Sequence, residues 1–370
     1  MPLQYAIWSF EMQYDNVVYI NGREIALDKP SYFVADIAAN HDGDLERAKA
    51  LIWLAKEAGA DAAKFQHFTA EKIVSDVGFR SLGGQFSHQA SWKKPVFEIY
   101  RDYECKRDWN LELIETARKA GIDFLTTPYD TEAVDLFDAY LPAYKIGSGD
   151  ITWVDFIEYV ARRRKPLMLA TGASDIRDVE RAVAGILKHN RQLILMQCNT
   201  NYTGSVENFR FINLKVLQAY ALKYPGMVLG LSDHSPGHAT VLGSIALGAR
   251  VIEKHFTDDT TRVGPDHAFS MTPSTWRDMV DRSRELEAAL GDGVKRVEEN
   301  ESQTVVLQQR CLRLTRDVAS GEMLSETDIE ALRPAPVGAM RPYELSVALG
   351  RRMLKDRKRG EALQYSDLEA

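Results

Sequence analysis

The segments VLGLSDH (228–234) and VIEKHF (251–256) decide how this chain folds, because each is an apolar run that ends in a histidine with polar neighbours. Such runs are typical of buried strands that deliver a side chain to one rim of a sheet or barrel. His234 and His255 stand at matching ends of consecutive strand–helix units, so the pattern predicts that they can share a metal ion. The alternative is that each is an ordinary hydrogen-bonded core or surface residue.

Strand-like runs of the same kind recur along the chain and alternate with helical patterns. Eight are recognised, at residues 31–38, 62–66, 124–128, 143–147, 167–171, 193–197, 228–233 and 251–256. Helical patterns lie between them, for example at residues 45–58, 109–120, 175–188 and 238–247. This alternation favours a closed parallel barrel over a doubly wound sheet. The sequence therefore predicts an α/β fold, a TIM (β/α)8 barrel over residues 31–290.

Two segments outside the eight-strand pattern have predicted roles beside the barrel. Residues 1–30 contain a polar hairpin-like piece, in which residues 17–20 and 23–25 are joined by Asn21-Gly22, the signal of a tight hairpin turn. We expect this hairpin to serve as a lid or a barrel plug. Residues 67–108 are polar, aperiodic and long for a strand–helix connection, so we expect them to cover the active site.

The C-terminal part of the chain differs in composition from the barrel region. Residues 291–304 are charged and begin with Gly291-Asp292-Gly293, which is typical of a linker. Beyond them, DVASGEMLSETDIEA (317–331) matches DRKRGEALQYSDLEA (356–370) at an offset of 39 residues. Residues 305–370 are therefore predicted to form a small pseudo-symmetric β-rich domain, in which the basic run 351–359 is a solvated face.

Composition limits the classes of function. The net charge of −7 disfavours a general role on nucleic acid or on an anionic membrane, because both require a dominant basic face. The three cysteines, Cys105, Cys198 and Cys311, form no CxxC pair, and no signal-peptide pattern or long apolar run is present. We therefore expect a cytoplasmic protein without structural zinc, whose anionic ligands are met by a local positive pocket.

Polar side chains gather where the predicted strands end, and in a barrel these ends converge on one pocket. They include Asp36, Asn40, His41, Lys64, Gln66, Thr126, Thr127, Lys145, Ser148, Asp150, Thr171, Gln197, Asn199, Thr200, Ser232, Asp233 and Glu253. Lys64 and Lys145 lie inside apolar runs, where an unpaired ammonium group is costly to bury. The pattern indicates a phosphate and carboxylate cradle. A structural ion pair and a Schiff-base lysine are the alternatives.

The two histidines suit an open metal site. Neutral imidazole nitrogens, completed by waters and substrate oxygens, are compatible with Mn²⁺ or Mg²⁺. A third protein ligand is not evident, so zinc held by three side chains is a poorer match. Asp266, in the segment Arg262 to His267, adds an acid near the same rim.

Several motifs together resemble the N-acetylneuraminate (sialic acid) synthase family, a group of nonulosonic acid synthases. They are VADIAANHDGD (34–44), EAGADAAKFQ (57–66), PAYKIGSGD (142–150), GLSDH (230–234), VIEKHFT (251–257) and GPDH (264–267). The C-terminal repeat resembles the antifreeze-like (SAF) domain of that family. The resemblance extends over residues 31–370.

The resemblance implies a metal-dependent transferase that condenses phosphoenolpyruvate with an N-acylated aldose and releases phosphate. By motif position, His234 and His255 match the metal ligands, and the phosphoenolpyruvate cradle matches Lys64, Gln66, Lys145, Ser148, Thr200 and Ser232. Asp36, Asp150 and Asp266 match acids that meet the sugar and the reacting centre, so that these three acids and the two lysines are the candidate catalytic residues. The family forms a domain-swapped homodimer, in which Arg333 helps to bind the acyl sugar across the partner's barrel.

The chain departs from the family pattern at five positions. The family usually has glutamate at Asp36 and Asp150, histidine at Gln197, serine at Ala170 and glycine at Ala335. Each aspartate withdraws its carboxylate by roughly one bond length, enough to lose a direct hydrogen bond. We therefore hypothesise that the acceptor is not ordinary N-acetylmannosamine.

Three other functions remain compatible with the residues. A Schiff-base pyruvate lyase would use Lys64 or Lys145 as a nucleophile and need no metal. A catalytically altered sugar-binding homologue would explain the shortened acids. A related 3-deoxy-sugar-acid synthase would take a phosphorylated acceptor and require an additional basic patch.

Overall fold

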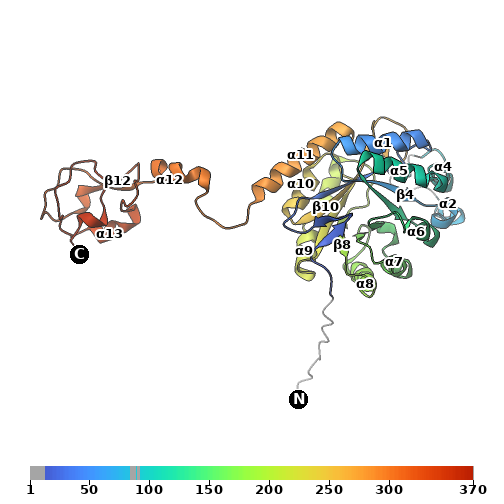
Figure 1. Ribbon diagram of the computed structural model, residues 1–370, viewed down its shortest axis with the longest axis horizontal. Helices are drawn as coiled ribbons and strands as arrows, with labels where there is room; N and C mark the ends of the chain where they lie inside the picture. Colours follow the sequence, from blue (N-terminus) through green and yellow to red (C-terminus); the bar gives the residue numbers. More distant parts are fainter. Residues whose placement is uncertain (1–12, 84–88, 90–91, 370) are drawn as a thin grey trace, which may run out of the picture. The chain divides into compact units, whose positions relative to one another are not determined.

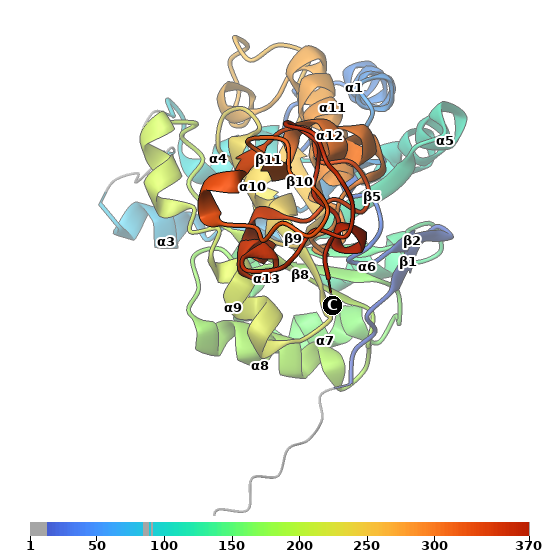
Figure 2. The ribbon, with the colours of Figure 1, turned by 90° about the vertical axis from the view of Figure 1, so that its left-hand side faces the viewer.

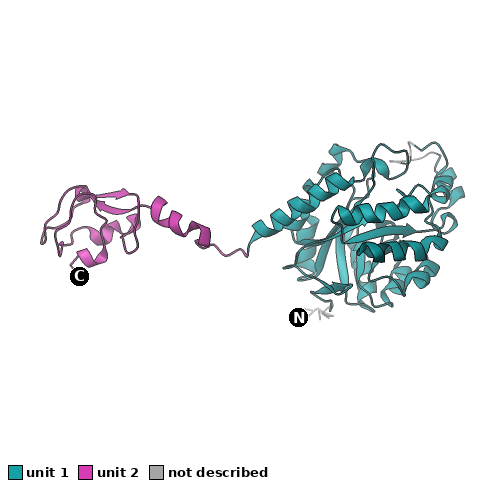
Figure 3. Ribbon diagram, turned by 45° about the horizontal axis from the view of Figure 1, so that its top comes forward, with its two compact units in different colours: residues 1–291 teal, residues 292–370 magenta. Residues whose placement is uncertain are grey.

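The structure is a computed structural model that describes residues 13–83, 89 and 92–369. The chain divides into two compact units, Met1–Gly291 and Asp292–Ala370 (Figure 3). Each unit has hydrophobic clusters of its own. The units are therefore described separately.

Eight parallel strands form the sheet of unit 1. Its hydrogen-bonded order is β5-β4-β3-β10-β9-β8-β7-β6, and β5 and β6, at the two ends of this order, contact each other. The sheet therefore curls into a nearly closed barrel, and the predicted (β/α)8 fold is confirmed. The strands are β3 (Tyr32–Asp36), β4 (Ala62–His67), β5 (Asp123–Pro128), β6 (Tyr144–Ile146), β7 (Leu167–Ala170), β8 (Leu193–Cys198), β9 (Val228–Asp233) and β10 (Ala249–His255).

Helices surround these strands (Figures 1 and 2). Their ends follow local sequence signals: Asp175 and Asp178 form a capping box that begins α8, and Gly121 ends α5 in the left-handed conformation at φ 68°. The helices are α1 (Leu45–Glu57), α2 (Ala70–Ile73), α3 (Asp76–Ser81), α4 (Val96–Asp102), α5 (Asn110–Ala120), α6 (Thr131–Phe137), α7 (Val154–Ala161), α8 (Ile176–Leu187), α9 (Val216–Lys223), α10 (Ala239–Ala246) and α11 (Pro273–Leu290).

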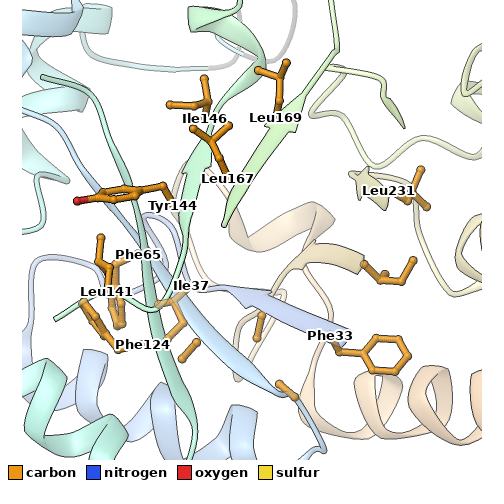
Figure 4. Close-up of a cluster of buried hydrophobic side chains, with 14 of the residues drawn as sticks. Phe33, Ile37, Phe65, Phe124, Leu141, Tyr144, Ile146, Leu167, Leu169 and Leu231 are labelled. Carbon is orange, nitrogen blue, oxygen red and sulfur yellow. The ribbon is translucent and has the colours of Figure 1, made fainter. Parts of the chain in front are cut away.

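Side chains alternate between the outer and inner faces of each strand, and they form a separate hydrophobic core on each face of the barrel wall. Side chains that face outward, including Phe33, Phe65 and Leu231, pack with the helices in one large cluster (Figure 4). Side chains that face inward form a second cluster, which includes Val34, Met196, Val228 and Val251. Both faces of the barrel are therefore apolar over most of its height, as expected for parallel strands covered by helices.

The predicted N-terminal hairpin is confirmed, and it plugs the barrel. β1 (Val18–Ile20) and β2 (Arg23–Ile25) pair antiparallel through Asn21 and Gly22, whose φ angles of 48° and 79° are those of a type I′ turn. Val18, Ile20 and Ile25 belong to the same cluster as the inward side chains of the barrel. The hairpin thus fills the barrel interior with apolar side chains below the strand ends.

Unit 2 is built around a small antiparallel sheet of β11 (Cys311–Leu314) and β12 (Ile329–Leu332). It also contains α12 (Ser302–Gln308) and α13 (Leu345–Ala348). The expectation of a plain linker over 291–304 is corrected at its end, because α12 begins at Ser302 and a 3-10 turn (Glu299–Glu301) precedes it. Glu299 and Glu301 lie in the first turn of that short helical element, where acids are favoured.

The two copies of the C-terminal repeat bond to each other reciprocally. The backbone N–H groups of Val318 and Arg357, which lie 39 residues apart, each donate to the other's carbonyl oxygen at 2.9 Å. Asp317 accepts from the N–H of Arg359 at 2.9 Å, and its counterpart Asp356 accepts from the N–H of Ser320 at 2.8 Å. The repeat therefore forms a pseudo-two-fold pair, as the sequence predicted.

The basic run 351–359 is largely paired within unit 2. Lys355 and Arg357 both contact Asp367, at 2.9 and 2.7 Å, and Lys358 contacts Asp317 at 2.9 Å. These contacts favour the structural interpretation of the run over a ligand-binding one. Within the described residues, no helix combines the length and the apolar character that crossing a membrane requires.

Candidate active site

The candidate active site lies where the inward face of the barrel changes from apolar to polar. On β10 the inward sequence runs from Val251 through Glu253 to His255, because side chains alternate between the two faces. On β4 the corresponding series is Ala62, Lys64 and Gln66. Strand parity therefore places charged groups at the carboxyl ends of several strands around one mouth.

Lys64 and Asp36 form a buried ion pair at this mouth. Lys64 Nζ lies 2.8 Å from Asp36 Oδ2, and both side chains are nearly inaccessible to solvent. Lys64 also donates to Thr127 Oγ1 at 3.2 Å, and Gln66 Nε2 donates to Asp36 Oδ2 at 3.0 Å. Burial alone would raise the pKa of Asp36, but the charge and hydrogen bond of Lys64, together with the charges of His255 and Lys145, outweigh burial and lower that pKa to about 2. Asp36 is therefore ionised at neutral pH.

Lys145 is held in the same manner by a second acid. Its Nζ donates to Glu253 Oε1 at 2.7 Å, and Ser232 Oγ donates to the same oxygen at 3.1 Å. Both lysines thus have a protein carboxylate beside them, so their burial does not by itself require an anionic ligand. This corrects the sequence argument, which weighed the ion pair as the alternative to an anion cradle. An ammonium group has three donors, and within the described residues Lys145 uses one.

Small polar residues surround Gly172 beside Lys145. Ser148 Oγ accepts the N–H of Gly172 at 2.9 Å. A Cβ atom placed on Gly172 would lie 2.6 Å from Thr200 Cγ2 and 3.0 Å from both Cys198 Sγ and Ser148 Oγ. The ends of β6, β7 and β8 therefore bring Ser148, Gly172 and Thr200 together around a backbone that approaches without a side chain. Such an arrangement suits an oxyanion.

The two histidines are neighbours, as the sequence predicted. The ring centroids of His234 and His255 are 5.3 Å apart. His234 Nδ1 lies 2.9 Å from the carbonyl oxygen of Asn199, so this nitrogen carries the proton in the neutral ring and Nε2 presents a lone pair. His255 Nδ1 is buried and has no hydrogen-bond partner among the residues that the structure describes, and burial lowers the pKa of His255 to about 3. His255 is therefore neutral. Burial lowers the pKa of His234 as well, but the contacts of this ring with Cys198 and with the carbonyl oxygen of Asn199 outweigh burial and raise its pKa. Each ring can ligate a metal ion in its neutral form.

The donor set fits an open divalent metal site. Asp36 Oδ2 lies 3.7 Å from His255 Nε2, and Asp266 Oδ2 lies 3.8 Å from His255 Nδ1. Over the described part of the chain, no group of three or more His, Cys, Asp or Glu side chains is arranged to hold an ion unaided. Two imidazoles with carboxylates close by therefore match a site completed by water and substrate oxygens.

Two acids, Asp150 and Asp266, line a cavity of about 410 Å³ whose wall also includes Gln66, Ser148 and His255. Burial raises the pKa of Asp150 to about 6, and Asp150 Oδ2 has no hydrogen-bond partner among the described atoms. Burial also raises the pKa of Asp266 to about 6, although Asp266 Oδ2 accepts the N–H of Ala39 at 3.1 Å. Carboxyl groups with such pKa values can both give and take protons near neutral pH.

The segment predicted to cover the site forms one wall of this cavity. It is not aperiodic throughout, because it contains α2, α3 and α4. It contributes the lining residues Phe68, Ile73, Gln89, Trp92, Ile99, Tyr100 and Tyr103, which face Gln66, Tyr129, Gly147, Ser148, Gly149, Asp150, Tyr202, His255, Pro265 and Asp266. The cavity is therefore apolar and aromatic on one side and acidic on the other.

Two polar residues at strand ends lie outside the site. Asp233 faces the helices, where it accepts from Lys254 and Thr240. Gln197 also faces outward and donates to the carbonyl oxygen of Ile212 at 3.0 Å. Arg333 lies in unit 2 with an exposed side chain, and unit 1 alone supplies all the other predicted site residues.

Sequence reasoning left several residues of this region without a role. Glu253 was noted at its strand end, but its bond to Lys145 follows only from the closure of the barrel. Cys198 hydrogen-bonds His234, and this contact lowers the pKa of the thiol although burial raises it. Tyr100, Tyr129 and Tyr202 line the cavity. The alternation of side chains along β8 could have placed Cys198 at the site, because Cys198 is two residues beyond the inward-facing Met196 and therefore faces the same side.

Fold and site together define a (β/α)8 barrel whose mouth combines buried lysines, small polar groups around Gly172 and a pair of neighbouring histidines. The chain belongs to the NeuB family, whose family model matches residues 51–295. The model of the SAF domain matches residues 309–369.

Named relatives agree with this family. The chain is 32% identical over 345 residues to the N,N'-diacetyllegionaminic acid synthase of Legionella pneumophila, a match that covers 92% of this chain and 95% of that protein. It is 32% identical over 348 residues to a pseudaminic acid synthase of Campylobacter jejuni, covering 92% and 98%. The solved N-acetylneuraminic acid synthetase of Leptospira borgpetersenii is 26% identical with a TM-score of 0.68, covering 79% of this chain and 96% of that one.

Proposed function

We propose that this protein condenses phosphoenolpyruvate with an N-acylated aldose to give a nonulosonic acid and phosphate. The observation that carries the proposal is the pair of buried lysines, Lys64 and Lys145, at the same barrel mouth as the Ser148–Gly172–Thr200 cluster, of which Ser148 lines the cavity. The family membership and the named relatives, which are synthases of related sugar acids, support it.

The residues of the mouth suit the two anionic groups of phosphoenolpyruvate. Lys145 and Ser232 share Glu253, so both can turn a donor toward a phosphate placed beside Gly172. Lys64 and Gln66 share Asp36 in the same way and are suited to the carboxylate. These groups hold phosphoenolpyruvate while its C3 attacks the aldehyde carbon of the acceptor sugar.

The metal site is assigned to His234 and His255, with Mn²⁺ or Mg²⁺ as the proposed ion. When bound, a divalent ion supplies a positive charge that polarises the aldehyde oxygen. Asp36 and Asp266, beside His255, orient the acceptor and water around it.

The reaction then requires proton transfers that Asp150 and Asp266 are placed to make. Attack by C3 leaves a cation at C2, and water adds there and loses one proton. The remaining C2 hydroxyl gives its proton to the departing phosphate as the C–O bond breaks, which leaves the 2-keto acid. The oxygen of the former aldehyde takes up one proton to become the new hydroxyl group. Both acids face the cavity, and burial raises the pKa of each to about 6, so they exchange protons readily near neutral pH.

The acceptor is proposed to differ from ordinary N-acetylmannosamine. Asp36 and Asp150 are shorter by one methylene than the glutamates expected from the family pattern, and Asp36 is committed to Lys64 and Gln66. The space this leaves near the acids suits a differently substituted aldose. We assign binding of its acyl group in part to Arg333 of a partner subunit in a domain-swapped homodimer.

A Schiff-base lyase that uses Lys64 is disfavoured by the charge of this lysine. Burial opposes protonation of Lys64, but Asp36 and Glu253 raise the pKa of Lys64 above its ordinary value. A lysine nucleophile must be unprotonated, and this environment stabilises the ammonium form.

The decisive experiment measures phosphate release from phosphoenolpyruvate with a panel of N-acyl and diacetamido aldoses, with and without Mn²⁺, and identifies the product by mass spectrometry. We expect metal-stimulated release with one acceptor class and its loss in Lys145→Gln. The exposed Lys119→Gln is the matched control. Aldose binding without phosphate release throughout the panel would instead identify a sugar-binding homologue, and preference for N-acetylmannosamine would refute the acceptor assignment.

A further inference from the structure

Three successive residue pairs connect the ends of β9 and β10, which run side by side (Figure 2). Ser232 lies opposite Glu253, Asp233 opposite Lys254, and one step further His234 lies beside His255. The first and third pairs face the barrel interior, and the second faces the helices, because side chains alternate. Each histidine is therefore directly preceded by a member of the outward pair.

The outward pair is a closely bonded, buried ion pair. Lys254 Nζ lies 2.5 Å from Asp233 Oδ2, and both side chains are 1% exposed. Lys254 also donates to the carbonyl oxygen of Ser235 at 2.6 Å. Asp233 Oδ2 accepts in addition from the hydroxyls of Ser235 and Thr240, at 2.8 and 2.7 Å. Lys254 thus binds residues on both sides of His234 at once.

The backbone does not provide this connection, because the ladder between β9 and β10 ends at the pair of Asp233 and Lys254. His255 is still paired with Asp36 of β3, whereas His234 lies beyond the last residue of β9. His234 itself contacts Asn199, Cys198 and the ring of Tyr202. The turn that carries His234 is held to β10, and so to His255, by the bonds of Lys254 to Asp233 and Ser235.

We propose that Asp233 and Lys254 are positioning residues, which form a clamp on the outer face of the barrel that fixes the spacing of His234 and His255. The clamp touches no ligand and acts only through the two imidazoles. The inference rests on the proposed function in one respect, namely that these imidazoles bind a metal ion.

The test is the double variant Asp233→Asn/Lys254→Met, which removes both charges together, because removal of one would leave the other buried and uncompensated. Mn²⁺ binding is measured without substrates, from the electron paramagnetic resonance signal of the free ion. We expect binding about 10- to 100-fold weaker than in the unaltered protein, as for other groups that orient metal ligands. Thr240→Val, which removes one bond to Asp233, is a milder second variant and should weaken binding less.

The matched control is Thr126→Val, which removes the buried hydrogen bond of 2.7 Å between Thr126 Oγ1 and His67 Nδ1 on β5 and β4. That bond also joins neighbouring strands but adjoins neither His234 nor His255. An equal loss of Mn²⁺ binding in the control and the double variant would show a general effect of strand destabilisation and overturn the clamp. Binding within threefold of the unaltered protein in both clamp variants would overturn it as well.

A second readout needs no metal. Crystals of the metal-free double variant should show a separation of the His234 and His255 ring centroids that departs from 5.3 Å. An unaltered protein that binds no Mn²⁺ would refute the metal part of the proposed function, and the ring separation alone would then decide the clamp. A separation that does not change would refute the clamp whatever the enzyme does.

Discussion

Gly172→Ala is expected to damage the proposed phosphate cradle through a single added methyl group. The new Cβ would lie 2.6 Å from Thr200 Cγ2 and 3.0 Å from Cys198 Sγ and Ser148 Oγ, all closer than carbon atoms normally approach. Thr200 and Cys198 come from the end of β8 and Ser148 from the end of β6, so relief of the contact must move these two strand ends away from Gly172. Overpacking of this kind costs about 1–3 kcal/mol of folding free energy.

The matched control is Gly149→Ala, because a Cβ there meets nothing within 4 Å although Gly149 lines the same cavity. Thermal unfolding should show a lower midpoint for Gly172→Ala, by roughly 2–4 °C for each kcal/mol lost, and little change for the control. Steady-state kinetics should show a higher KM for phosphoenolpyruvate in Gly172→Ala, with the KM for the aldose changed less. An unchanged donor KM in a variant that does lose stability would refute the placement of phosphate beside Gly172.

Three further variants test the acids, the metal site and unit 2. Burial raises the folded-state pKa of Asp150 from its ordinary value of 3.8 to about 6. Ionisation of this carboxyl therefore lowers the free energy of unfolding as the pH rises from about 4 to about 6. Asp150→Asn should therefore stabilise the protein at about pH 8 by at most about 3 kcal/mol and have little effect at about pH 4, whereas the exposed Glu57→Gln should show no such pH dependence in chemical denaturation. His255→Ala should abolish metal-stimulated turnover with the circular dichroism spectrum retained, and metal dependence equal to that of the unaltered enzyme would remove His255 from the site. Arg333→Ala should raise the KM for the aldose more than the KM for phosphoenolpyruvate, and an equal effect of the control Arg359→Ala would contradict a specific role for Arg333.

The barrel was predictable from the sequence because each strand is a compact apolar run and the apolar residues of each helix recur at helical spacing. The predicted strand at 62–66 and the observed β4 (Ala62–His67) differ by one residue, and similar agreement holds for the other seven. The helix α12 was missed because residues 302–308 are a short, mostly exposed segment adjoining a charged one. Tertiary structure, rather than an apolar stripe, determines such short elements.

The residues that form the site were more predictable from the sequence than the ion pairs between them. Polar residues at strand ends identified Lys64, Lys145, His234 and His255, but the list also included Asp233 because the alternation of faces was not applied to it. The partner of Lys145 is Glu253, 108 residues away, and no local pattern joins two residues across a barrel. Contacts of this kind depend on strand order and shear, which become known only when the sheet closes.

The reciprocal bonds in unit 2 make its two repeats mutually dependent. Asp317 accepts from the N–H of Arg359 and Asp356 accepts from the N–H of Ser320, so each repeat satisfies part of the other's backbone. Deletion of either repeat would leave a carboxylate and an amide without their bonds in the one that remains. Unit 2 therefore resembles a dimer whose two subunits are joined in one polypeptide. Because the repeats are covalently linked, their association does not depend on the protein concentration.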